Sequence, residues 1–128
     1  MSKFNFFNDL NTNSCYIIAE AGLNHNGSIN VAKELIDVAV EAGADAVKFQ
    51  KRTVSILATN DVLDLPDNRF PEFGETYREI REFIEFGFSD YEVLKNYAES
   101  KNIDFMVTAF DTDAVDFLER LGVSSYKL

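Results

Sequence analysis

The sequence predicts an α/β protein with a parallel sheet of the (β/α)8 TIM-barrel type, on three observations. Short apolar runs alternate with amphipathic stretches of helical spacing, and the strand–helix order repeats along the 128 residues. The links from helix to strand are very short, as in AGAD before AVKF. Polar residues close the apolar runs, so they would gather at one end of a parallel sheet, where barrels bind their ligands.

The first strand–helix unit opens the repeat. The first predicted strand is Cys15–Ala19, a run rich in β-branched and aromatic residues. A polar loop, Glu20–Gly27, leads to a helix that Ser28 caps and that stops before Gly43. The second strand is predicted at Ala46–Phe49, which directly follows that stop signal.

The later elements continue the same rhythm. Ser89, with Glu92 three residues on, forms a capping-box pattern that predicts the start of a helix. The third strand is predicted at Ile103–Val107, and Asp111 is placed to cap the next helix. The fourth strand is Val123–Leu128, so the chain ends inside a strand.

Residues 51–88 interrupt the rhythm as an insertion after strand two, with an amphipathic stretch at Glu75–Phe86. Such a long segment after a strand is typical of a lid or substrate loop. The domain interpretation is an N-terminal extension over residues 1–14 and the N-terminal half of a barrel over residues 15–128. A whole barrel needs about 250 residues, so we expect only the first three and a half βα units here.

Composition excludes several functions. With 22 acidic and 12 basic side chains the formal charge is -10, which argues against binding to nucleic acid or to an anionic membrane. One cysteine, Cys15, excludes an internal disulfide and a cysteine-based zinc site. No apolar run could span a bilayer, so a soluble, cytoplasmic protein is expected.

The candidate site consists of the polar residues at the predicted strand ends. These are Glu20, Lys48, Gln50, Thr108 and Lys127. Two lysines with a carboxylate and a hydroxyl suit a phosphorylated, anionic small molecule. The alternative is that the lysines only form structural ion pairs with carboxylates such as Glu20. Their shared location at the strand ends favours function for the set.

Two further polar residues lie outside those strand ends. His25, the one histidine, supplies at most one metal ligand, so it is interpreted as a loop residue with local hydrogen bonds, and no metal site is predicted. Asn68 is either a turn residue or a hydrogen-bonding contact to a sugar, and the turn interpretation ranks first on the sequence alone.

Four stretches carry a resemblance to the N-terminal half of the N-acetylneuraminate (sialic acid) synthase family. They are IIAEAGLNHNG (17–27), AGADAVKFQ (42–50), VTAFD (107–111) and VDFLERLGVSSYKL (115–128). The resemblance implies a (β/α)8 barrel with a further C-terminal domain, in a homodimer. It also implies condensation of phosphoenolpyruvate with N-acetylmannosamine or a related amino sugar, with release of phosphate. A divalent metal, Mn²⁺ or Mg²⁺, is implied too, with ligands outside this chain.

The resemblance also assigns roles to the candidate residues. It implies that Lys48, Thr108 and Lys127 bind the phosphate, and that Glu20 acts as a catalytic residue beside the reacting carbons. Gln50 would lie close to the substrates and Asn68 would contact the amino sugar. The 128 residues on their own are expected to be inactive.

Two alternatives remain at this point. One is another phosphoenolpyruvate-dependent, aldol-type barrel synthase, such as a 3-deoxy-heptulosonate phosphate synthase. The other is a non-catalytic half-barrel that acts as an interaction module through its open strand edge.

Overall fold

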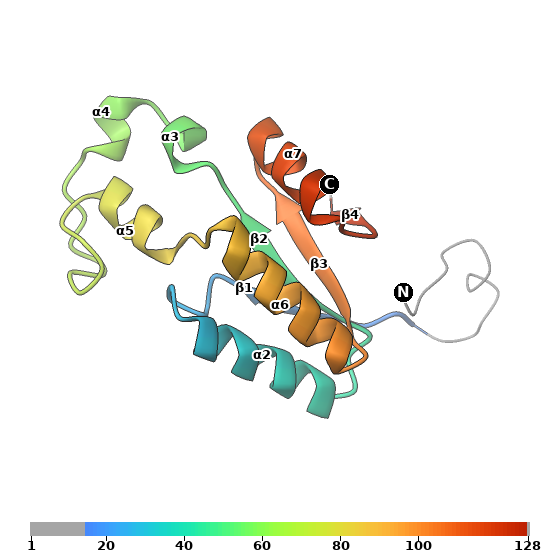
Figure 1. The fold of residues 1–128 in the computed structure, drawn as a ribbon. Coiled ribbons are helices and arrows are strands. Elements are labelled where there is room, and N and C mark those ends of the chain that lie inside the picture. The colour runs from blue at the N-terminus through green and yellow to red at the C-terminus, as the bar shows by residue number, and fades with distance from the viewer. Residues whose placement is uncertain (1–14, 128) are drawn as a thin grey trace.

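The structure, a computed structural model, describes residues 15–127; the predicted N-terminal extension (residues 1–14) and Leu128 lie outside the described residues. The elements in chain order are β1 Ile18–Gly22, α2 Ile29–Glu41, β2 Ala46–Lys51, α3 Val54–Leu57, α4 Asn60–Leu63, α5 Tyr77–Ile84, α6 Phe88–Ser100, β3 Asp104–Ala109, α7 Thr112–Leu121 and β4 Tyr126–Lys127. The strands form one four-stranded parallel sheet in the order β1-β2-β3-β4 (Figure 1).

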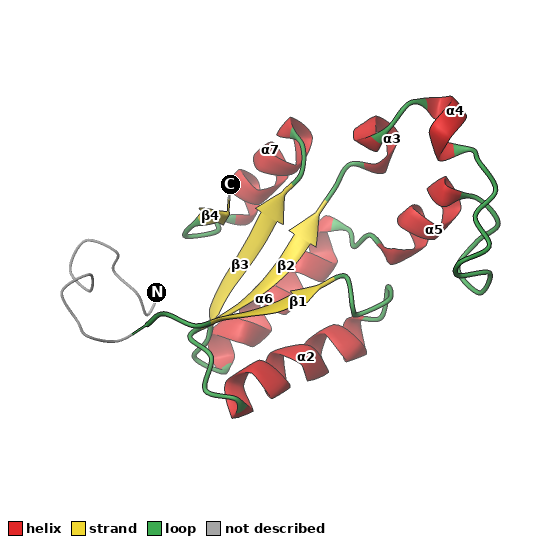
Figure 2. Ribbon diagram, turned by 180° about the vertical axis from the view of Figure 1, so that it is seen from behind, coloured by secondary structure: helices red, strands yellow, loops and turns green. Residues whose placement is uncertain are grey.

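The helices that connect the strands lie on one face of this sheet. Helices α2 and α6 cover it together, and α7 lies beside β3 and β4 (Figures 1 and 2). A sequential strand order with all crossovers on one side is the arrangement found in (β/α)8 barrels, whereas a doubly wound sheet carries helices on both faces. The predicted parallel α/β class is confirmed, and within residues 15–127 the second face of the sheet carries no helix.

The hydrophobic core lies between the sheet and these helices. Val47 and Phe49 of β2 and Val107 of β3 are completely buried, and Ile36 of α2 and Leu94 of α6 pack from the other side. Each such side chain contributes about 1.5–3 kcal/mol by leaving water. Because side chains alternate along a strand, burying these residues turns their polar neighbours to the open face.

Two predicted helix caps are confirmed. Ser28 Oγ accepts a hydrogen bond from the backbone N–H of Val31 at 3.3 Å, and Asp111 Oδ1 accepts one from Ala114 at 2.7 Å. Helix α7 ends at Leu121, and its C-cap residue Gly122 has the left-handed conformation, with φ of 71°. Among residues 15–127, no helix is both long enough and apolar enough to cross a membrane.

The predicted start of the helix at Ser89 is wrong. Helix α6 begins at Phe88, with Gly87 as its N-cap residue. In the first turn of α6, the Asp90 carboxylate accepts a hydrogen bond from the backbone N–H of Gly87 at 3.0 Å. The predicted capping box of Ser89 and Glu92 would have left this N–H group without a partner.

The strand boundaries also differ from prediction. Strand β1 begins at Ile18, three residues after the predicted start, because its ladder begins where Ile18 meets Ala46 of β2. Strands β2 and β3 each run two residues beyond their predicted ends, as far as Lys51 and Ala109. Glu20, Gln50 and Thr108 therefore lie within strands rather than after them. The described part of the fourth strand is short, Tyr126–Lys127.

The insertion between β2 and α6 carries three helices, α3, α4 and α5, and extends away from the sheet (Figure 1). Helix α5 covers most of the predicted amphipathic stretch and buries Ile80 and Ile84. Thr76 and Glu79 form its capping box: Glu79 N–H donates to Thr76 Oγ1, and Thr76 N–H donates to Glu79 Oε2, both at 3.2 Å.

Candidate active site

Five of the six predicted site residues gather on the open face of the sheet. In the parallel ladders Glu20 lies opposite Lys48, Gln50 opposite Thr108, and Thr108 opposite Lys127. Residues in register on neighbouring strands share a face. We call these five residues the strand-end cluster.

Lys48 is the centre of the strand-end cluster. Its ammonium group pairs with the carboxylate of Glu20 and donates a hydrogen bond to Thr108 Oγ1 at 3.1 Å. The Lys48 side chain is only 12% exposed, whereas that of Glu20 is 49% exposed. The structural ion pair of the alternative interpretation is thus present. It is, however, part of a network in which the Thr108 hydroxyl also contacts Lys48 and the Gln50 amide contacts the same Glu20 carboxylate.

A β-bulge next to Glu20 makes room for this network. The register between β1 and β2 shifts between Glu20 and Gly22, and Gly22 has a φ of 57°. A Cβ atom on Gly22 would lie 3.3 Å from Glu20 Oε1 and 3.4 Å from Gln50 Nε2. Glycine thus leaves space for the hydrogen bond of 3.4 Å that Gln50 Nε2 donates to Glu20 Oε1. Bulges of this kind are over-represented next to active sites.

The end of β2 is fixed from the helix side by Tyr91 of α6. The buried Tyr91 hydroxyl donates a hydrogen bond to the backbone carbonyl of Gln50 at 2.7 Å. Burial raises the pKa of Tyr91 far above its ordinary value, so the phenol keeps the proton that it donates. This bond holds the backbone that carries the Gln50 side chain.

Asn68 is not brought together with the other five residues. It is exposed in the loop between α4 and α5, and Figure 1 shows that this loop lies at the outer part of the insertion. Its neighbour Asp67 is buried and accepts hydrogen bonds from the Arg69 side chain, which defines a local turn. The sugar contact assigned to Asn68 therefore stays a prediction.

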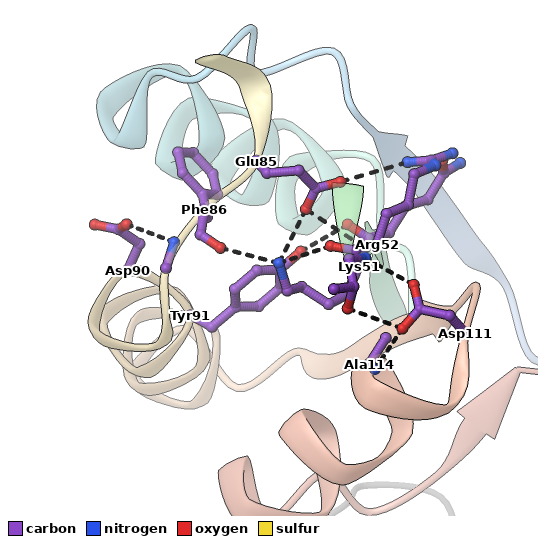
Figure 3. Close-up of polar contacts among 11 residues, drawn as sticks. Lys51, Arg52, Glu85, Phe86, Asp90, Tyr91, Asp111 and Ala114 are labelled. Atoms are coloured by element: carbon purple, nitrogen blue, oxygen red, sulfur yellow. Dashed lines mark hydrogen bonds and ion pairs between the residues drawn. The ribbon is translucent and has the colours of Figure 1, made fainter. Parts of the chain in front are cut away.

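Sequence reasoning missed a second charged group beside the cluster, on the helix side of the sheet. Lys51 Nζ lies 3.2 Å from Glu85 Oε2, at the end of α5, and donates to the carbonyl oxygen of Phe86 at 3.4 Å (Figure 3). The two charged side chains are only 12% and 9% exposed. Burial raises the pKa of Glu85, and the nearby Lys51 charge opposes that rise. The signal in the sequence was the spacing: residues 48 and 51 of one strand must face opposite sides.

Asp111 has a second role besides the cap of α7. Its carboxylate also accepts hydrogen bonds from the backbone N–H of Thr53 at 2.7 Å and from Thr53 Oγ1 at 2.9 Å (Figure 3). The first residues of the insertion are thereby attached to the segment that follows β3.

His25 behaves as the local interpretation predicts. It is buried, its Nδ1 accepts the backbone N–H of Gly27 at 3.1 Å, and its ring stacks on Phe86 at 4.1 Å between centroids. Burial lowers its pKa to about 4, so the imidazole is neutral at physiological pH. Within the described part of the chain, no group of three or more His, Cys, Asp or Glu residues could hold a metal ion.

The same loop contains a glycine whose replacement should be costly. Gly27 has a φ of 76°, and an added Cβ would lie 2.6 Å from the backbone oxygen of Phe83. Gly43 has a similar φ of 75° but open space around the added atom. We expect Gly27→Ala to lower the free energy of unfolding by about 3 kcal/mol and Gly43→Ala by about 1 kcal/mol, because only the first adds a clash to the left-handed strain. Urea denaturation of the two variants measures the difference, and equal losses would contradict the clash.

Comparison with known proteins identifies the family. Residues 35–128 match the NeuB family. The chain belongs to the NeuB family. Curated relatives of the chain are named as synthases of legionaminic acid and of N-acetylneuraminate 9-phosphate, so the predicted resemblance to the sialic acid synthase family is confirmed.

Two of these NeuB relatives illustrate the similarity. The chain is 43% identical over 117 residues to N,N'-diacetyllegionaminic acid synthase of Legionella pneumophila, covering 90% of this chain and 33% of the relative. It is 40% identical over 114 residues to human N-acetylneuraminate-9-phosphate synthase, covering 89% and 32%. The chain therefore spans about a third of the length of these curated NeuB relatives.

A solved structure agrees with the NeuB assignment. The N-acetylneuraminic acid (sialic acid) synthetase of Leptospira borgpetersenii, crystallised in complex with citrate, superposes with a TM-score of 0.66 at 36% sequence identity. The match covers 91% of this chain and 36% of that chain.

Proposed function

We propose that this chain forms the first three and a half βα units of the catalytic (β/α)8 barrel of a nonulosonic (sialic) acid synthase. The enzyme would condense phosphoenolpyruvate with N-acetylmannosamine or a related N-acetylated amino sugar and release phosphate. The names of the NeuB relatives support the product class. The strand-end cluster supports an anionic substrate, because it holds a lysine at the carboxyl ends of parallel strands.

The position of Lys48 is the observation that carries the proposal. An ammonium group has three N–H donors, and the contacts with Glu20 and Thr108 engage two of them. The third would bind a phosphate oxygen, and the Thr108 hydroxyl would bind another. Lys127, opposite Thr108 on the next strand, would add a second positive charge at the same place. Such fixed charges stabilise phosphate as it departs.

The proposed reaction joins C3 of phosphoenolpyruvate to the aldehyde carbon of the sugar, whose oxygen takes up a proton. Water then adds to C2 and loses a proton, which gives a tetrahedral intermediate. Its bond from C2 to the phosphate oxygen breaks, inorganic phosphate leaves, and the C2 hydroxyl becomes a carbonyl as its proton departs. Glu20, at the exposed rim beside Lys48, would orient the water or accept its proton.

The divalent metal implied by the resemblance, Mn²⁺ or Mg²⁺, does not fit residues 15–127, where no ligand group of three is present. Its ligands would lie outside this chain, and so would the rest of the barrel and a further C-terminal domain. We expect the intact protein to be a cytoplasmic homodimer, and the 128 residues alone to be inactive.

Phosphate release tests the proposed function. The intact protein, supplied with phosphoenolpyruvate and Mn²⁺, should release phosphate with at least one N-acetylated sugar from a panel of N-acetylmannosamine, its 6-phosphate and a diacetamido hexose. Mass spectrometry should find one condensed acid per phosphate. Erythrose 4-phosphate, which lacks an N-acetyl group, serves as the control. Turnover with erythrose 4-phosphate alone would favour the heptulosonate type of synthase, and no turnover with any sugar would reject both.

A further inference from the structure

Arg52, the residue after β2, makes its shortest side-chain contact with the strand-end cluster. We propose that Arg52 is a positioning residue, which orients the side-chain amide of Gln50 towards Glu20. This inference rests on the proposed function, in which Gln50 lies close to the substrates. No role for Arg52 follows from the family resemblance or from the match to the NeuB family.

The hydrogen bonds of Gln50 define the orientation of its amide. Arg52 Nη2 donates to Gln50 Oε1 at 2.6 Å, whereas Gln50 Nε2 donates to Glu20 Oε1 at 3.4 Å. A guanidinium group can only donate hydrogen bonds. The oxygen of the Gln50 amide, and not its nitrogen, must therefore point towards Arg52. The contact with the half-exposed Glu20 is long and weak by comparison. Arg52 therefore decides which way the Gln50 amide points.

Arg52 is itself held by two elements from outside the cluster. Its guanidinium carbon lies 3.9 Å from the centre of the Phe110 ring, just after β3. On the other side, Arg52 Nη1 lies 3.9 Å from Glu85 Oε1, and the Arg52 backbone N–H donates to Glu85 Oε2 at 3.4 Å (Figure 3). The side chain is only 12% exposed. Packing of this kind locks the rotamer of a supporting residue.

The contacts of Arg52 distinguish it from a residue that only forms a buried ion pair. Arg52 Nη1 and Glu85 Oε1 lie 3.9 Å apart, which is too far for a hydrogen bond. Neither atom has another hydrogen-bond partner within residues 15–127. The short, directed bond of the Arg52 side chain is the one to Gln50. Glu85 thus supplies an opposite charge, and the hydrogen-bonding geometry of Arg52 serves Gln50.

A double-mutant cycle tests this role in the intact protein. Arg52→Met should lower kcat/KM for phosphate release by about tenfold, the effect expected for losing a charged hydrogen bond that positions a substrate-binding group. In a Gln50→Ala background the same change should cost less than about twofold, because Arg52 acts through Gln50. Arg78→Met is the matched control, since Arg78 lies in the same insertion but pairs with Asp64 and Asn60. It should leave kcat/KM unchanged in both backgrounds.

The resonances of the Gln50 side-chain amide provide a readout that does not depend on turnover. In ¹⁵N-labelled protein they should shift in Arg52→Met and stay in place in Arg78→Met. Unchanged resonances, or an equal loss of kcat/KM with and without Gln50, would overturn the positioning role. If the wild-type protein releases no phosphate, the proposed function fails, and the resonances still decide the role of Arg52.

Folding of the variant is checked by its thermal melt. Where Arg52→Met lowers the melting temperature by more than about 5 °C, Arg52→Lys replaces it in both experiments. Lysine keeps the positive charge between Glu85 and Phe110 but not the planar fork that fixes the Gln50 amide.

Discussion

Replacing Lys48 by methionine should lower kcat/KM for phosphoenolpyruvate in the proposed reaction by about 100- to 1000-fold, the usual cost of removing one preorganised group that stabilises charge in a transition state. Lys48 is the most enclosed cation of the strand-end cluster, and Thr108 and Glu20 fix its position. Methionine preserves most of the side-chain volume and removes the charge. The measurement is steady-state phosphate release by the intact protein.

Stability separates this loss from misfolding. Glu20, the partner of Lys48, is half-exposed, so losing that pair should change the free energy of unfolding by less than about 1 kcal/mol. Lys95→Met, which removes a lysine from an exposed pair with Glu99 on α6, is the control for the loss of a lysine and should keep full turnover. A Lys48→Met enzyme that turned over as fast as the Lys95→Met control would remove Lys48 from the proposed site.

Replacing Lys51 by methionine should have the opposite profile, with a large loss of stability. Lys51 faces the helix side of the same strand and is the near counter-charge of the buried Glu85. Without Lys51 the buried Glu85 carboxylate keeps only the more distant Arg52 guanidinium as a counter-charge, so we expect the free energy of unfolding to fall by about 3 kcal/mol. The hydrogen bonds from Lys51 to the carbonyls of Arg52 and Phe86 are lost as well.

The cost of Lys51→Met should depend on pH. Burial already raises the pKa of Glu85, and the Lys51 charge limits that rise, so the variant should have a still higher Glu85 pKa. A carboxyl group whose pKa is raised by folding contributes stability below its ordinary pKa of about 4.3 and loses it as pH rises through the raised value. The stability gap between the variant and the wild type should therefore widen from about pH 5 to pH 8.

Urea denaturation at the two pH values measures this gap. The exposed-pair variant Lys95→Met again serves as the control, with an expected loss below about 1 kcal/mol at both values. Two outcomes would contradict this expectation: the Lys51→Met variant loses the same free energy of unfolding at both pH values, or it loses no more than the control. Either result would show that Lys51 does not stabilise the charged form of Glu85.

Much of the site could be predicted because strand alternation is a local rule. Burial of Val47 and Phe49 on the helix side requires Lys48 and Gln50 to face the other way. The parallel order of the strands then places Thr108 beside them. The first step needs only the residues of one strand, and the second needs only the order of the strands and helices along the chain.

Most of the remaining features depend on partners that local patterns do not reveal. Glu85 lies 34 residues after Lys51, inside an irregular insertion with several acidic residues, so nothing local selects it as the partner. Strand β1 starts where its backbone first pairs with β2. Helix α6 starts where the Asp90 carboxylate caps its first turn, rather than at a serine cap. Tertiary contacts decided the first two of these cases, whereas the start of α6 was set by a local contact between residues three apart in sequence.

The two attachments of the insertion have a consequence for its length. Thr53, at its beginning, is tied to Asp111, and Glu85, near its end, is tied to Lys51, so both ends are anchored beside the same strand end. The cost of closing a loop between fixed ends rises by only about 0.6 kcal/mol for each doubling of its length. The length of the segment between these anchors can therefore change at a small cost in stability, while the lysine and its neighbours on the sheet stay in place.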